Sequence, residues 1–239
     1  AFYFLIKNKF HLSAASITVS MLCKSYVLIV LPLIIIYLFK NTKLQNLLIY
    51  CIIILISYLL ISYPFILTKE YQFFVLNSPE QNLIFSAFHI VSSKKFLWIP
   101  AILMILYGRF FYYSKINKDL LLGFINISFI ILFALTYPVP AWYIWIVPFI
   151  SMYFLDLDDS DHNKALGLFF LFTIFYIFYS LFVYIHPLQE KKDFIDIIFL
   201  NNQIDLKYQF SSKINGIIFT LFNTTIFIFA LIIMKRAIA

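Results

Sequence analysis

One lysine, Lys24, stands inside an apolar stretch that runs from residue 12 to residue 40. A charge at the centre of a membrane-spanning helix costs about 2.5–3.5 kcal/mol on insertion scales, so such a residue usually faces a cavity or marks a turn. A single helix over residues 12–39 would exceed the roughly 20 residues that span a bilayer. The alternative is two short helices, 12–23 and 25–39, that meet at Lys24 on one face of the membrane.

The composition predicts an integral membrane protein. Hydrophobic residues make up 63% of the 239 residues and charged residues only 12%, and long apolar runs alternate with short basic clusters. The formal net charge of +7 points to topology and anionic lipid headgroups rather than to nucleic acid, because the basic residues lie at the ends of the runs. Cys23 and Cys51 both lie in apolar surroundings, which indicates neither a disulfide nor a metal site.

We therefore expect an all-α fold, a polytopic transmembrane helical bundle with a short helical hairpin and two longer extracytoplasmic loops, forming one domain over residues 1–239. The expected spans are 12–23, 25–39, 44–67, 96–113, 119–137, 141–155, 165–186 and 214–234. The loop 68–95 carries apolar clusters typical of an interfacial amphipathic helix or a lid on the bilayer surface. The first residues, AFYFLI, read like the tail of an earlier helix, so we expect that the N-terminal part of a longer protein precedes them.

Charge distribution favours the hairpin, because short cytoplasmic loops carry an excess of Lys and Arg. With a turn at Lys24, one side of the membrane receives more than half of the 18 basic residues, all in short connections or at the end of the chain. These residues are Lys7, Lys9, Lys40, Lys43, Arg109, Lys115, Lys118, Lys164, Lys235 and Arg236. The Lys24 turn, loop 68–95, the turn at 138–140 and loop 187–213 then share the extracytoplasmic face.

An aromatic turn follows at residues 137–148. Pro138 and Pro140 end one helix and begin the next, since proline is tolerated in a first turn but not in a helix interior. Trp142, Tyr143 and Trp145 stand where an aromatic belt would lie.

An acidic run comes next. It contains Asp156, Asp158, Asp159, Asp161 and His162. Its spacing lacks the glycine and the terminal glutamate of an EF-hand loop, so we read it as a solvated cytoplasmic loop, 156–164, and expect no metal.

Two segments, VSMLCKSYVLIVLPL and PVPAWYIWIVPF, together resemble the membrane half of GT-C-type glycosyltransferases, closest to the mannosyltransferase-like branches. In that superfamily a short helix ends in a lysine and an apolar helix with a proline follows, here Lys24 and Pro32. An aromatic-rich helix start of the form PxWYxxWxxP comes later, here at Pro140–Pro148. The resemblance covers residues 1–155. It implies a multi-span enzyme that takes a sugar from a polyprenyl-phosphate carrier on the extracytoplasmic face.

A donor of this kind needs a cation near the interface and aromatic surfaces for the sugar. Lys24 would bind the donor phosphate and stabilise it as a leaving group, with the Ser25 and Tyr26 hydroxyls beside it. The alternative is that Lys24 only snorkels to the interface. Trp142 and Tyr143 would stack on the sugar ring, or serve only as membrane anchors.

Polar residues in loop 68–95 are further candidates. Asn77, Glu80 and Gln81 suit hydrogen bonding to sugar hydroxyls, or form a solvated turn at Pro79. His89 and the pair Lys94–Lys95 would assist the phosphate, and His186 is a weaker candidate on the same face. The family's catalytic base is an acidic residue in the first extracytoplasmic loop, which we expect upstream of Ala1.

These features predict a membrane glycosyltransferase that moves a mannose-like hexose from a polyprenyl-phosphate carrier to a glycan, lipid or protein acceptor. We expect no protein-bound cofactor and no nucleic-acid partner, and a place in the bacterial cytoplasmic membrane with the active face extracytoplasmic. Two alternatives remain, a polysaccharide-repeat transporter or flippase and an oligosaccharide polymerase. Transporters carry polar residues at mid-membrane, whereas here these residues gather at one face, which favours the enzyme.

Topology can be tested with single cysteines at Ser78 and Ser160 in a background that lacks Cys23 and Cys51. An impermeant thiol reagent added to intact cells should label position 78 and leave position 160 unlabelled, because only the first lies outside in the hairpin arrangement. Labelling at 160 but not at 78 would overturn the hairpin.

Overall fold

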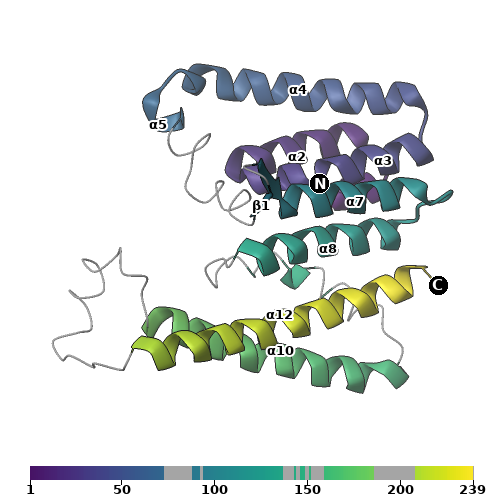
Figure 1. The fold of residues 1–239 in the computed structure, drawn as a ribbon. Coiled ribbons are helices and arrows are strands. Elements are labelled where there is room, and N and C mark those ends of the chain that lie inside the picture. Colours follow the sequence, from purple (N-terminus) through teal and green to yellow (C-terminus); the bar gives the residue numbers. More distant parts are fainter. Residues whose placement is uncertain are drawn as a thin grey trace. The chain divides into compact units, whose positions relative to one another are not determined.

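The computed structural model describes residues 1–72, 88–91, 94–136, 143, 146–148, 151, 159–185 and 208–238. Over these residues the chain is helical apart from one pair of short strands (Figure 1). The predicted all-α class is therefore confirmed for nearly all of the described structure, and the strand pair is the exception. Contacts divide the chain into two compact units, one built on Ala1–Thr136 and one on Tyr137–Arg236.

The first unit carries most of the described elements. In chain order they are α1 (Phe2–Ile6), α2 (Phe10–Cys23), the 3₁₀ helix η1 (Ser25–Ile29), α3 (Leu31–Asn41), α4 (Leu44–Ile66), α5 (Lys69–Tyr71), β1 (Phe88–Val91), β2 (Lys94–Leu97), α7 (Trp98–Tyr112) and α8 (Lys118–Thr136). The predicted segments 12–23, 44–67 and 119–137 match α2, α4 and α8 to within two residues at each end.

The predicted break at Lys24 is confirmed. Lys24 has an extended backbone, with φ −149° and ψ 118°, and separates α2 from η1. The expected helix 25–39 begins as the 3₁₀ helix η1 and becomes α-helical only at Leu31. Pro32, in the first turn of α3, has no N–H to donate back into the preceding turn, so it disfavours a continuous α-helix through this point.

Small side chains bring α2 against α4, and this pair forms the most extensive helix–helix contact in the first unit. Ser13, Ala14 and Thr18 are buried on the inner face of α2. The Ser13 hydroxyl shares a hydrogen bond of 3.4 Å with the hydroxyl of Tyr50 on α4. Small residues allow two helix backbones to approach closely, which substitutes for hydrophobic burial where the surroundings are themselves apolar.

Helix α8 forms the core of the first unit with α3 and α7, both of which it contacts. Asn117 starts it, since its side-chain oxygen accepts a hydrogen bond from the Leu120 N–H at 2.7 Å. The Phe124 ring of α8 lies 4.7 Å from the Phe110 ring of α7. Most of α8 is consequently buried, and in this it differs from the largely exposed α4.

The helices of the first unit run back and forth, which places their connections at two ends. The α3–α4 and α7–α8 connections lie at one end, whereas α5 and the strand pair lie towards the other (Figure 1). A hydrogen bond of 2.9 Å from the Asn41 side-chain amide to the Ile116 carbonyl joins the two connections at the first end.

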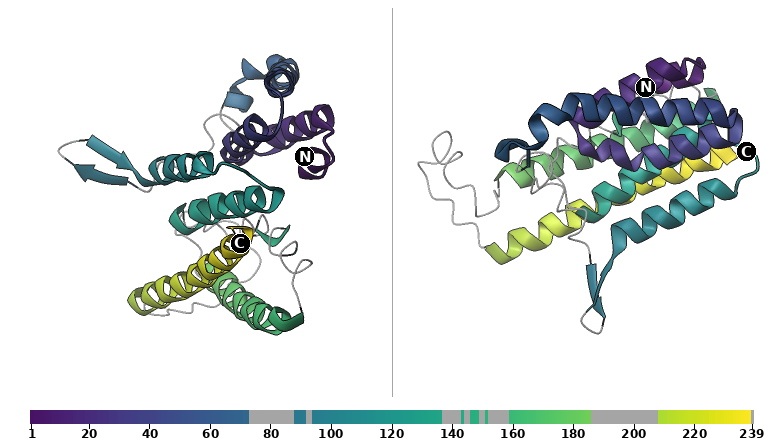
Figure 2. Two further views of the ribbon diagram at one scale, coloured as in Figure 1. Left: turned by 90° about the vertical axis from the view of Figure 1, so that its right-hand side faces the viewer. Right: turned by 90° about the horizontal axis from the view of Figure 1, so that it is seen from above.

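Strands β1 and β2 correct the expectation of an interfacial helix over their part of loop 68–95. They pair antiparallel, with Phe88 opposite Leu97 and Val91 opposite Lys94, and they project from the start of α7 (Figure 2). The segment FHIV and the segment KKFL are separated by two residues, Ser92 and Ser93, the spacing of a tight hairpin. The start of the predicted span 96–113 consequently belongs to β2, and α7 begins at Trp98.

The second unit contains α10 (Asp159–Ile185) and α12 (Tyr208–Ile238), which correspond to the expected spans 165–186 and 214–234. Both helices begin earlier than predicted. The loop predicted at 156–164 is wrong from Asp159 onward, and α12 begins inside the loop predicted at 187–213. Acidic side chains in a first helical turn interact favourably with the unpaired N–H groups there, so the acidic run is compatible with a helix start. The predicted span 141–155 lies mostly outside the described residues.

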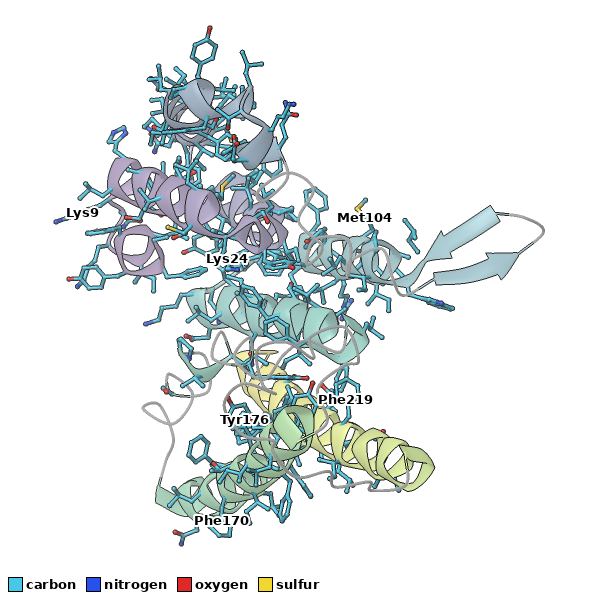
Figure 3. The ribbon with its side chains drawn as sticks, turned by 90° about the vertical axis from the view of Figure 1, so that its left-hand side faces the viewer. Lys9, Lys24, Met104, Phe170, Tyr176 and Phe219 are labelled. Carbon is cyan, nitrogen blue, oxygen red and sulfur yellow. The ribbon has the colours of Figure 1, made fainter. Side chains whose placement is uncertain are left out.

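Aromatic rings fill the space between α10 and α12. The Phe222 ring of α12 lies 5.3 Å from that of Phe172 and 5.5 Å from that of Tyr179. Phe219 lies 5.7 Å from Tyr179 by ring centroids. Phe170, in contrast, points away from this cluster and is exposed (Figure 3).

Two helices of the described residues, Leu44–Ile66 and Lys118–Leu135, are long and apolar enough to span a membrane. Shorter apolar helices accompany them at Phe10–Cys23, Ser25–Asn41, Trp98–Tyr112, Ala165–Leu181 and Gly216–Ile232.

The α2–α4 contact can be tested by enlarging one small residue. Ala14→Leu should lower the free energy of unfolding by about 1–3 kcal/mol, because Ala14 is fully buried and a larger side chain would force the helices apart. Ala15→Leu is the matched control, since Ala15 is exposed on the same helix and should change stability by less than about 0.5 kcal/mol. Unfolding in detergent micelles measures both, and equal effects would contradict the packing described.

Candidate functional site

The turn at Lys24 is the part of the predicted site that the structure describes best. The Lys24 backbone N–H closes α2 by donating to the Ser20 carbonyl at 2.9 Å, and the side chain is exposed. Figure 3 views the molecule from the end at which this turn lies and labels Lys24 there. An exposed ammonium at a helix end is available to an anionic group, which fits the phosphate-binding role predicted for it.

Ser25 and Tyr26 follow directly and start η1. Both residues are half-buried, and the Tyr26 hydroxyl oxygen is buried. Of the three residues predicted to bind the donor phosphate, Lys24 is thus the one whose side chain is exposed.

Tyr107 of α7 is a residue that the sequence interpretation missed. Its hydroxyl donates a hydrogen bond of 2.7 Å to the carbonyl of Ile29, the last residue of η1. The α-helical ladder of α3 begins one residue later, with the Val30 carbonyl accepting from Ile34 at 3.2 Å. The signal in the sequence was Pro32, because a proline leaves carbonyl groups in the preceding turn that need donors from elsewhere. Tyr107 anchors the segment that follows Lys24.

The residues that follow α4 lie at the end of the first unit at which α4 finishes (Figure 1). The Thr68 hydroxyl accepts a hydrogen bond of 3.3 Å from the Tyr71 N–H and so starts the short helix α5. The Gln72 side-chain amide donates to the Ile66 carbonyl at 3.3 Å. These local bonds turn the chain at the end of α4, before the segment that carries the predicted sugar-binding residues.

Most of the predicted sugar-binding residues, Asn77, Glu80, Gln81 and Trp142, lie outside the described residues, as does His186. His89, Lys94 and Lys95 are described in their backbone only, in β1 and β2, where His89 pairs with Phe96 and Lys95 with Ile90.

Tyr143 lies in the core of the second unit. Its side chain is 1% exposed, and its hydroxyl donates a hydrogen bond of 3.3 Å to the side-chain oxygen of Asn223 on α12. Its ring stands edge-on to Phe222 at 4.5 Å and to Tyr179 at 5.9 Å. In this structure the ring packs against other rings rather than offering a face to a sugar, and its role in sugar binding stays a prediction from the sequence.

One polar side chain stands out in the core of the first unit. Asn126 of α8 is fully buried, and neither its amide nitrogen nor its amide oxygen has a hydrogen-bond partner among the described residues. Nearby in the helix, the buried Ser128 hydroxyl bonds to the Phe124 carbonyl at 2.9 Å. A buried amide without partners is costly, by about 1–3 kcal/mol, so Asn126 has unused capacity to bind a polar group.

Metal ligands do not gather in the described parts of the chain. No three His, Cys, Asp or Glu side chains there come close enough to hold an ion.

No protein-family model, no curated protein and no solved structure matches this chain. The likeness to GT-C-type glycosyltransferases accordingly rests on the motifs around Lys24 and Trp142.

Truncation at Tyr143 separates a core role from a sugar-binding role. We expect Tyr143→Phe to lower the free energy of unfolding by about 0.5–1.5 kcal/mol, through loss of the hydrogen bond to Asn223. Tyr143→Ala should cost about 3–5 kcal/mol, the range for emptying a buried aromatic site.

Tyr63→Ala is the control, because Tyr63 is exposed on α4 and its truncation leaves no cavity. Thermal unfolding in micelles measures all three variants. Unchanged stability in Tyr143→Ala together with lost sugar transfer would instead assign Tyr143 to ligand binding.

Proposed function

We propose that this protein is a membrane glycosyltransferase that moves a hexose from a polyprenyl-phosphate carrier to a glycan, lipid or protein acceptor. The observation that carries the proposal is the exposed Lys24 at a break between two apolar helices. That break lies towards the end of the first unit at which α4 and α8 finish and α7 begins (Figure 1).

The membrane placement is supported by the outer face of α4. Only 17% of its most apolar window is buried, and Leu55 and Leu60 are 59% and 70% exposed. Exposing such a face to water is unfavourable by about 25 cal/mol per Å² of apolar surface. A contiguous apolar face on a helix long enough to cross a bilayer is matched instead by lipid chains.

The Lys24 turn suits the transfer chemistry. In that reaction the bond between the anomeric carbon of the sugar and the phosphate oxygen breaks, and the phosphate leaves with the bonding electron pair. The acceptor oxygen forms the new bond to the same carbon and gives its proton to a base. Negative charge grows on the leaving phosphate, so a nearby ammonium stabilises the transition state more than the bound donor.

The GT-C resemblance implies an acidic residue as this base, and we assign none of the described residues to that role. Lys24 stands exposed between α2 and η1. A lysine at a helix end can keep its ammonium at the interface while its aliphatic stem and the carrier's tail lie among lipid chains.

A transporter is the second candidate, and Asn126 is the observation that favours it. Polar groups buried at mid-span are typical of proteins that pass a polar solute through the bilayer. Asn126 lies near the middle of α8, and its amide is unpaired among the described residues. The exposed position of Lys24 argues against a transporter. A phosphate-linked solute that crosses the bilayer would need a cation within it, whereas this cation is at a helix end.

The charge of Lys24 provides the test. Lys24→Met keeps an unbranched apolar stem and removes the ammonium, so we expect sugar transfer from a polyprenyl-phosphate-linked hexose to fall roughly 100- to 1000-fold. Lys24→Arg retains the charge with another shape and should recover only part of the rate.

Lys69→Met is the matched control. Lys69 is an exposed lysine in α5. The Lys69→Met variant should therefore transfer sugar at the parental rate. Near-parental transfer by Lys24→Met at equal membrane levels would reduce Lys24 to an interfacial anchor and remove the main support for the enzyme.

A further inference from the structure

A basic and aromatic surface lies at the end of the first unit opposite the strand pair, and the proposed reaction makes no use of it. We define the basic end as residues 37–47 and 109–119, the two connections α3–α4 and α7–α8 with the helix turns beside them. Five basic residues lie in it, namely Lys40, Lys43, Arg109, Lys115 and Lys118, with Asp119 as its one carboxylate.

Within the described part of the chain, no carboxylate forms an ion pair with a cation of the basic end, and four of the five cations are exposed. Asp119 stands in the first turn of α8, where the unpaired N–H groups of the helix already favour a negative charge. The basic end therefore carries an excess of positive charge that attracts anions from outside the chain.

Aromatic rings hold two of these cations in place. The Lys40 ammonium lies 4.6 Å from the centre of the Phe111 ring, and the Arg109 guanidinium lies 4.9 Å from that of Tyr113. Such contacts restrain long side chains that would otherwise be free to move. Phe39 stacks on Phe111 at 6.2 Å, and about half of each ring remains exposed.

The backbone beneath the rings is also tied together. Asn41 at the end of α3 donates from its side-chain amide to the Tyr37 carbonyl at 3.0 Å and to the Ile116 carbonyl at 2.9 Å. The second bond links the α3–α4 connection to the α7–α8 connection, so Lys40 and Arg109 are carried by segments that are joined.

The chemistry of the surroundings selects the anion. Both helices that are long and apolar enough to cross a bilayer, Leu44–Ile66 and Lys118–Leu135, start within the basic end. Exposed rings beside cations at the start of such helices match the level of lipid headgroups. An anionic lipid offers a phosphate to the cations and acyl chains to the rings and the helix faces, whereas a free phosphate or a nucleic acid offers only the charge.

We propose that the basic end binds the headgroups of anionic phospholipids, with Lys40 and Arg109 as the principal cations. This inference rests on the membrane placement proposed above and not on sugar transfer. A chain that transfers no sugar still has the surface, and a chain without the surface still has Lys24.

The test uses the full chain in neutral detergent micelles, with the affinity for phosphatidylglycerol and for phosphatidylcholine measured by native mass spectrometry. The parent should bind phosphatidylglycerol more tightly. Lys40→Gln should weaken that binding about fivefold, the effect expected for one cation at an anionic surface, and Lys40→Gln with Arg109→Gln about 25-fold. Lys69→Gln, which removes one charge from another exposed position, should leave the affinity unchanged.

Two further arms keep the result decisive. Lys40→Arg with Arg109→Lys keeps both charges and should retain most of the binding, and circular dichroism should show that every variant is folded. Inorganic phosphate at the lipid concentration should displace no lipid, because it lacks the acyl chains.

Any of four results would overturn the proposal. They are equal affinity for the two lipids in the parent, parental affinity in the folded double glutamine variant, an equal loss in Lys69→Gln, and displacement of lipid by phosphate alone.

Discussion

The packing of the first unit depends on one backbone carbonyl that has no hydrogen-bond donor in its own helix and takes one from another element. Pro32 interrupts the ladder between η1 and α3, and the Ile29 carbonyl takes its hydrogen bond from Tyr107, 78 residues further along the chain. In apolar surroundings an unsatisfied backbone carbonyl costs several kcal/mol, so this bond requires α7 to lie beside η1. The contacts of α8 with α3 and α7 then complete the core of the unit.

Much of the helical architecture follows from local pattern. Apolar runs of the right length predicted α4 and α8 within a residue or two, and a lone charge inside an apolar run predicted the break at Lys24. The strand pair was missed because its stability depends on partners across the hairpin, such as Phe88 opposite Leu97, and strand propensity is set by such neighbours more than by the residues themselves. The early start of α10 was missed because an acidic run reads equally as a loop or as a first helical turn.

The candidate site, like the fold, could be predicted from the sequence only in part. Lys24 was predictable, since its charge conflicts with its neighbours in the sequence, and the structure places it at an exposed helix end. Tyr143 was read as a surface aromatic from the residues beside it, but its packing is decided by Tyr179, Phe222 and Asn223, far along the chain. Periodicity within one segment carries no information about such partners. The roles of Asn77, Glu80, Gln81 and Trp142 stay predictions, because these residues lie outside those that the structure describes.

The contrast between α4 and α8 has a consequence for how sequences of this kind diverge. Just 17% of the apolar window of α4 is buried, against 67% for α8. In the proposed membrane placement the exposed face of α4 meets only lipid acyl chains, which accept any apolar side chain, so Leu, Ile, Phe and Val can replace one another there with little effect on fitness. Positions in α8 such as Phe124 and Phe133 are held by the shapes around them, and volume changes there are costly. Over evolutionary time α4 should drift towards whatever apolar codons the genome favours, while α8 should preserve the record of common descent.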